Sequence, residues 1–294
     1  MLSVFIAPMI ILCVMCYTGQ TFFNKLFANN YPGSAAMATP VYAGIYGIVV
    51  AIVTFLLNGL HYTPSHLTLL LGLANGVILF LYNLGMIQAA RRGPYAIQSI
   101  VMLFGSIVVC IIFSAIYWGD RMTVLQIVGI LIMLAAFIVL NSGGLILRDI
   151  KKGYFFWVIS LFFTNGIYGV LMDAAQRIHP GERNDMIITT FLSSAIVSLI
   201  YLLLTQRKKA IEALAMGKKA ACCALISSIS AAFAVYLIMI IIGYIPSFIM
   251  YTIGNGSLLG VSAILSWAIL KEPISKNTLA GILMSVVSII MLSF

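Results

Sequence analysis

Long apolar stretches alternate with short polar segments along the whole chain. A helix needs about 20 apolar residues to cross a bilayer. Ten stretches approach this length and predict ten membrane-spanning helices, over residues 3–24, 34–57, 66–90, 94–117, 122–141, 153–173, 186–205, 219–242, 246–270 and 275–293. The segments between them are rich in Pro and Gly, which favour turns. They are too short to hold a soluble domain.

The composition agrees with a membrane protein. Of the 294 residues 63% are hydrophobic and 8% are charged, and the mean hydropathy is +1.13. Soluble domains carry about 25% charged residues, so this chain could not cover a water-exposed surface. The formal charge of +9 lies mainly in the short loops. In a chain embedded in a lipid bilayer this distribution indicates cytoplasmic loops and not binding to nucleic acid.

An internal repeat organises the chain. The stretch 94–129 aligns without a gap on the stretch 246–281, 152 residues later. In both copies a Pro (Pro94, Pro246) opens an apolar span and an acid (Asp120, Glu272) follows its end. Repeats are a primary signal of architecture, and this one divides the chain into copies at 1–146 and 147–294.

Each copy contains five predicted spans, which is an odd number. The second copy should therefore enter the membrane from the opposite side, giving an all-α membrane protein of two inverted five-helix repeats. Inverted repeats occur in many secondary transporters, which bind solutes near the midplane and alternate access by rocking one repeat on the other.

The chain resembles the drug/metabolite transporter superfamily, in its ten-helix branch with two EamA-type repeats. The resemblance rests on Trp118-Gly119-Asp120-Arg121 followed by Gln126 and Gly129, and on Lys271-Glu272-Pro273 followed by Ala280-Gly281. Asp120 departs from the usual Glu, and Lys271 replaces the second Gly. The resemblance implies transport of metabolites such as amino acids, often by export.

The repeated acids Asp120 and Glu272 are expected to cap the helices that follow them, because a helix N-terminus favours a carboxylate. A proton-coupling role is the alternative. The other acids also lie near predicted span ends, and none lies in the middle of a span. Acids inside a membrane usually mark ion or proton pathways, so their absence favours uniport or another form of coupling.

Without charges inside the spans, specificity should come from neutral polar and aromatic side chains that share helix faces. Each of these could instead join neighbouring helices, as polar residues often do in membranes, and Gly72-x3-Gly76 predicts a helix-packing notch. The predicted substrate-lining residues are Tyr17, Gln20, Tyr82, Asn83, Gln98, Ser99, Met102, Asn165, Tyr168, Tyr236, Tyr251 and Asn255.

Other chemistry finds little support in the sequence. His61, His66 and His179 are too scattered to predict a metal site, and the five cysteines lie in apolar spans. No catalytic triad, phosphate-binding loop or paired-carboxylate motif occurs. We therefore expect a protein that is not an enzyme and needs no cofactor.

The sequence thus predicts a carrier of small organic metabolites that acts by alternating access. Two alternatives remain: a carrier of quaternary ammonium or aromatic cations, which tyrosines could bind by cation–π contact, and a lipid-handling protein or enzyme subunit. We expect a multi-pass protein of the prokaryotic plasma (inner) membrane. Because one chain holds two copies, it should function as a monomer with a small-molecule substrate.

Two arguments on orientation disagree. All Lys and Arg residues except Arg121, Arg177 and Arg183 lie in or beside loops that follow odd-numbered spans. The positive-inside tendency then places both termini outside. The family resemblance implies termini inside. We favour the charge distribution.

Overall fold

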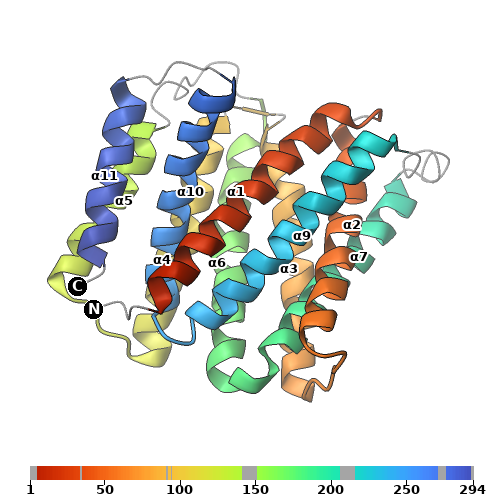
Figure 1. Ribbon diagram of the computed structural model, residues 1–294, viewed down its shortest axis with the longest axis horizontal. Coiled ribbons are helices and arrows are strands. Elements are labelled where there is room, and N and C mark those ends of the chain that lie inside the picture. The colour runs from red at the N-terminus through yellow and green to blue at the C-terminus, as the bar shows by residue number, and fades with distance from the viewer. Residues whose placement is uncertain are drawn as a thin grey trace. The chain divides into compact units, whose positions relative to one another are not determined.

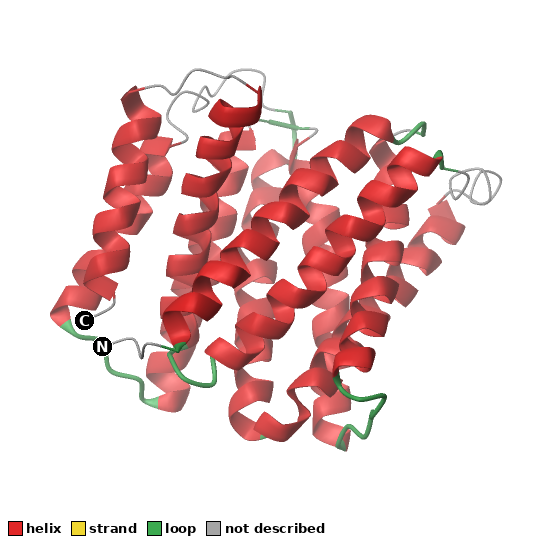
Figure 2. Cartoon of the chain, viewed as in Figure 1, coloured by secondary structure: helices red, strands yellow, loops and turns green. Residues whose placement is uncertain are grey.

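The computed structural model describes residues 5–33, 35–90, 92–93, 95–140, 151–205, 216–270 and 276–292, and these residues form helices joined by short loops (Figure 1, Figure 2). No strand occurs within them. The α-helices are α1 (Ile6–Asn30), α2 (Ala35–Leu57), α3 (His66–Ala90), α4 (Tyr95–Phe113), α5 (Val124–Leu140), α6 (Tyr154–Ile178), α7 (Arg183–Thr205), α9 (Lys218–Ile241), α10 (Ser247–Leu270) and α11 (Lys276–Leu292). A π-helical turn, η1 (Ser114–Trp118), extends α4, and a 3-10 turn, η3 (Pro180–Glu182), precedes α7.

Each predicted span corresponds to an α-helix of the described residues. Seven helical segments are long and apolar enough to cross a membrane, while Val124–Val139 and Leu279–Leu292 are shorter apolar helices. Polar backbone groups must be bonded internally in lipid, and a helix meets this need within one segment. The chain is therefore a multi-pass, all-helical membrane protein.

Two predicted span ends are wrong, at α1 and at α6. The first span was expected to end at residue 24, but α1 continues to Asn30. The sixth span was expected to end at residue 173, but α6 continues to Ile178. Hydropathy falls at this point because Asp173, Gln176 and Arg177 are polar. The helix nevertheless continues, since Asp173 and Arg177 are four residues apart and form an ion pair along one face of the helix.

The chain forms two compact units, and each unit takes segments from both sequence halves. Unit 1 comprises Met1–Val14, Gln88–Val170 and Tyr244–Phe294, and unit 2 comprises Met15–Ile87 and Leu171–Gly243. The limits 1–146 and 147–294 concern the two copies of the repeat and stay a prediction. The helices α1, α3 and α6 each contribute to both units.

In unit 1, α5 packs against α11, and α10 packs against α4, α5 and α11. The Ser288 hydroxyl donates to the Gly129 carbonyl at 2.6 Å, which joins α11 to α5. Figure 1 shows that α5 and α11 run in opposite directions, and that α4 and α10 begin at opposite ends of the unit. These pairs are the counterparts that the sequence repeat aligns.

In unit 2, α7 packs against both α2 and α3. Contacts of Gly44 with Leu199 and of Gly47 with Phe191 and Ala195 make α2 and α7 antiparallel. The predicted notch at Gly72-x3-Gly76 is confirmed: a Cβ atom at Gly72 would lie 2.6 Å from Thr189, and one at Gly76 would lie 2.4 Å from Ser193. The residue numbers rise together in these contacts, so α3 and α7 are parallel.

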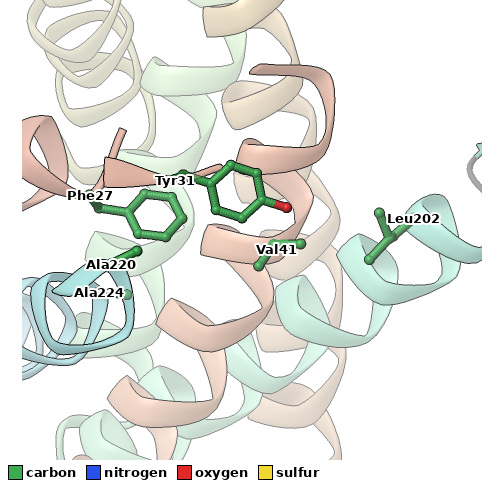
Figure 3. Close-up of a cluster of buried hydrophobic side chains, with 6 residues drawn as sticks. All are labelled: Phe27, Tyr31, Val41, Leu202, Ala220 and Ala224. Carbon is green, nitrogen blue, oxygen red and sulfur yellow. The ribbon is translucent and has the colours of Figure 1, made fainter. Parts of the chain in front are cut away.

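A hydrophobic cluster joins four helices of unit 2. Figure 3 shows Phe27 and Tyr31 from the end of α1 close to side chains of α2 and α9. Small side chains on α9 leave room for the aromatic rings. The buried members of this cluster are Phe27, Tyr31, Val41, Leu202, Ala220 and Ala224.

Candidate functional site

The predicted lining residues divide between the two units. Unit 1 contains Gln98, Ser99, Met102, Asn165, Tyr168, Tyr251 and Asn255. Unit 2 contains Tyr17, Gln20, Tyr82, Asn83 and Tyr236. The Ser99 side chain lies outside the described residues. Each unit holds a polar cluster of its own.

The unit 1 cluster connects α4 with α6 and α10. The Asn165 side-chain amide donates to the Met102 carbonyl at 2.9 Å. The Asn255 amide donates to the Ser106 hydroxyl at 2.9 Å. Gln98, one turn before Met102 on α4, is fully buried. Three neutral polar positions predicted from the sequence thus gather on one side of α4.

An aromatic side chain extends the unit 1 cluster. The buried Tyr251 ring of α10 lies against Gly169 of α6, where a Cβ atom would come within 2.9 Å of it. The Cys110 sulfur of α4 would also lie 2.9 Å from a Cβ atom at Gly169. Only glycine fits between them. The neighbouring Tyr168 is half-buried.

The unit 2 cluster connects α1, α2 and α9. The Ser227 hydroxyl donates to the Gln20 backbone carbonyl at 2.7 Å and also lies 2.7 Å from the Tyr42 hydroxyl. Because Ser227 has one proton to give, Tyr42 must donate to it. The Gln20 side-chain amide donates to the Tyr46 hydroxyl at 3.3 Å. Its Oε1 atom is buried without a partner in the described structure.

Aromatic rings surround this second cluster. The rings of Tyr42 and Tyr46 are stacked with centroids 5.6 Å apart. Phe27 and Phe191 continue the row at 5.3 Å on either side. Tyr42, Tyr46 and Ser227 were not predicted. The i, i+4 spacing of the two tyrosines in the second span was the signal that could have found them.

The other unit 2 predictions remain untested as lining residues. Tyr17, Tyr82, Asn83 and Tyr236 are all half-buried, on α1, α3 and α9. Their place in a binding site stays a prediction.

The predicted capping acids are only partly described. Glu272 lies outside the described residues. Before α5, Thr123 and Gln126 form a reciprocal cap: the Gln126 backbone N–H donates to the Thr123 hydroxyl at 3.2 Å, and the Thr123 N–H donates to Gln126 Oε1 at 3.1 Å. Asp120 is half-exposed, three residues before this cap. Its capping role stays a prediction.

One acid lies inside a span, contrary to expectation. The Asp173 side chain is 1% exposed, more than one turn before the end of α6, and its carboxylate lies 3.2 Å from Nε of Arg177, which is 24% exposed. A buried carboxylate without such a partner would be strongly destabilising. The pair lets this acid remain within the helix.

A polar corner closes one end of unit 2. The buried Asp185 carboxylate accepts hydrogen bonds from the Asn58 amide and the Thr63 backbone N–H, both at 3.2 Å. The Glu182 carboxylate accepts from the backbone N–H and hydroxyl of Ser65, at 2.9 and 2.8 Å. Two acids of the second half therefore hold the loop before α3 in place.

The histidines border this corner. His61 and His66 flank the loop that Glu182 holds, and the Glu182 N–H donates to the His179 carbonyl at 2.9 Å. They are less scattered than their sequence positions suggest. Among the described residues, no group of three His, Cys, Asp or Glu side chains could hold a metal ion.

Comparisons with known proteins address the fold and the family. Residues 152–294 match the EamA-like transporter family. No curated protein matches the chain. A solved structure, described only as a crystal structure of protein, is similar with a TM-score of 0.73 and 16% identity. The likeness covers 96% of this chain and 98% of that one, and at this identity it shows the fold alone.

The match falls on the second copy of the repeat, where the motif around Glu272 is found. The likeness in fold extends over nearly the whole chain. The resemblance noted in the sequence is thereby confirmed where the family model matches: residues 152–294 are those of an EamA-like transporter, a family of the drug/metabolite transporter superfamily.

Proposed function

We propose that the protein is a secondary transporter of small organic metabolites, such as amino acids or related amphipathic solutes, moved by export or facilitated diffusion. The observation that carries this proposal is the unit 1 cluster. There, neutral amide and hydroxyl groups from α4, α6 and α10 gather within apolar spans. Neutral hydrogen-bonding groups in an apolar setting suit a polar but compact solute.

Alternating access between inverted copies is part of this proposal. The aligned counterparts α2 and α7 are antiparallel in unit 2, and α5 and α11 are antiparallel in unit 1 (Figure 1). Antiparallel counterparts are expected when one copy crosses the membrane in the opposite direction. We further propose that the protein acts as a monomer in the prokaryotic plasma membrane.

Flux through proteoliposomes containing only the purified protein tests the proposal. We expect Gln98→Leu and Asn255→Leu each to lower amino-acid flux by about tenfold, because each removes hydrogen bonds worth about 1–3 kcal/mol. Asp120→Asn should change flux little. Thermal stability of each variant, measured in detergent, separates lost transport from lost folding.

Two outcomes would contradict these roles. Loss of flux in Asp120→Asn alone would make the acid the functional group. Uptake of choline in place of every amino acid would favour a cation carrier, to which the stacked Tyr42 and Tyr46 rings of unit 2 are suited.

A further inference from the structure

Four polar side chains of unit 2 are fully buried and have polar atoms without a hydrogen-bond partner in the described structure: Thr54, Asn75, Thr190 and Ser198. Two of these, Asn75 and Thr190, lie beside the contact between α3 and α7. Asn75 on α3 and Thr190 on α7 are each 0% exposed. Both polar atoms of the Asn75 amide and the Thr190 hydroxyl are unpaired. Buried polar groups are nearly always bonded, and lipid offers no partner. A pair of such groups on adjacent helices therefore calls for a ligand.

The contact between α3 and α7 brings these residues to one place. A Cβ atom at Gly76 would lie 2.6 Å from the Thr190 carbonyl oxygen, and one at Gly72 would lie 3.4 Å from the Thr190 backbone nitrogen. The Thr190 backbone thus touches α3 directly beside Asn75. Only glycine on α3 permits so close an approach.

Helical periodicity puts both side chains on the same flank of this contact. The facing pairs are Gly72 with Thr189 and Gly76 with Ser193. Asn75 comes one residue before Gly76 on α3, and Thr190 comes one residue after Thr189 on α7. At about 100° per residue, positions displaced in opposite senses on two parallel helices turn to the same side.

That flank is the buried side of α3 and α7, where Asn75 and Thr190 are 0% exposed. Val77 on α3 is 42% exposed, and Ile196 on α7 is 56% exposed. The same rotation places these apolar side chains on the opposite flank, where lipid would cover them. Asn75 and Thr190 therefore point away from lipid.

The chemistry of the two groups defines a ligand. A carboxamide offers two donors and one acceptor, and a hydroxyl offers both functions, without any charge. We propose that Asn75 and Thr190 form a neutral hydrogen-bonding subsite for a hydroxyl or carboxamide group of the transported solute. The inference rests on the proposed function, whose substrate class it narrows to solutes that carry such a group.

Threonine and valine are a matched pair of probes, because they differ in a hydroxyl against a methyl group. We expect L-threonine to raise the thermal midpoint of the purified protein more than L-valine does, and to cross liposomes about tenfold faster. A site that hydrogen-bonds a hydroxyl rejects the analogue without it. Asn75→Leu and Thr190→Val should each reduce this preference.

The stability of Asn75→Leu without solute provides a second readout. Removing an unpaired buried amide should raise the thermal midpoint while the preference for threonine falls, as expected where function opposes stability. Ser193→Ala is the control, because the Ser193 hydroxyl already donates to the Leu73 carbonyl at 3.1 Å. It should keep the preference.

Three results would overturn the subsite. One is equal response to threonine and valine, or response to neither, in the unsubstituted protein. Another is an unchanged preference in Asn75→Leu. The third is a lower thermal midpoint in that variant, which would assign the amide to a structural water or a protein partner. A binding preference without flux would support the subsite and contradict the transport function instead.

Discussion

At the scale of residues, several hydroxyl groups in the spans bond within their own helix. Thr164, Ser228 and Thr252 each donate to the carbonyl four residues earlier, at 2.7–2.8 Å. Such a bond uses the only proton of the hydroxyl, which can then accept from a ligand but not donate to it. A serine or threonine inside a span is therefore weak evidence for a site. The groups that cross between helices, such as Asn255 and Ser227, carry more information.

The Tyr42–Ser227 bond allows a sharp test at this scale. Ser227→Ala should lower the free energy of unfolding by about 1–3 kcal/mol, because it leaves the Tyr42 hydroxyl without its acceptor and removes a second hydrogen bond to the Gln20 carbonyl. Tyr42→Phe should cost less, about 1 kcal/mol.

A double-mutant cycle in detergent checks this order. In the Ser227→Ala background, Tyr42→Phe should be neutral or stabilising, since the hydroxyl it removes is already unpaired. Additive losses would show that the two hydroxyls do not depend on each other.

At the scale of elements, glycines set how closely the helices approach. In unit 1 a Cβ atom at Gly105 of α4 would lie 2.1 Å from the Phe162 carbonyl of α6, and one at Gly166 would lie 2.4 Å from Val109. The backbones of α4 and α6 are thus in contact, as small residues permit in membrane proteins. The same contact holds Asn165 within reach of Met102.

Gly105→Ala should therefore separate α4 from α6. The added methyl group meets backbone and not a flexible side chain, so we expect a loss of about 1–3 kcal/mol. This corresponds to a fall in the thermal midpoint of about 2–4 °C per kcal/mol. Gly181→Ala is the matched control, because nothing lies within 4 Å of its Cβ position. Equal stability of both variants would contradict the close contact.

The helices could be predicted from the sequence because an apolar run of sufficient length seldom forms anything other than a membrane-spanning helix. The end of α6 could not, since the ion pair of Asp173 with Arg177 lets polar residues continue a buried helix. The repeat identified α2 and α7 as counterparts, but the alignment could not show that these two helices pack against each other. For the lining residues, the sequence predicted which polar and aromatic side chains share a helix face, but not what each of them contacts. The bonds of Tyr42, Tyr46 and Gln20 depend on which helices meet, and periodicity does not determine this.

At the scale of the whole molecule, orientation in the membrane can be measured directly. Lys218, at the start of α9, lies beside the loop that follows the seventh span, one of the loops that hold most Lys and Arg residues. Gly181 lies in the loop that follows the sixth span, which is expected on the opposite face of the membrane. Both residues are exposed. If the positive side is cytoplasmic, the Gly181 loop faces outward.

A membrane-impermeant maleimide applied to intact cells should then label Gly181→Cys and leave Lys218→Cys unlabelled. The experiment needs a background in which the five native cysteines are replaced. Lysed cells, in which both positions should react, are the control. The reverse pattern would place the termini inside, as the family resemblance implies.

The mixed membership of the two units bears on how the protein is made. The ribosome releases α2 and α5 long before α7 and α11, the helices against which they pack. The helices α2 and α5 must therefore stay in the bilayer without their partners for a time. During that time lipid or an insertion chaperone must cover the faces that later pack against α7 and α11. A nascent polypeptide halted between the two copies would be an unfinished protein, open to proteolytic quality control, and not a stable half.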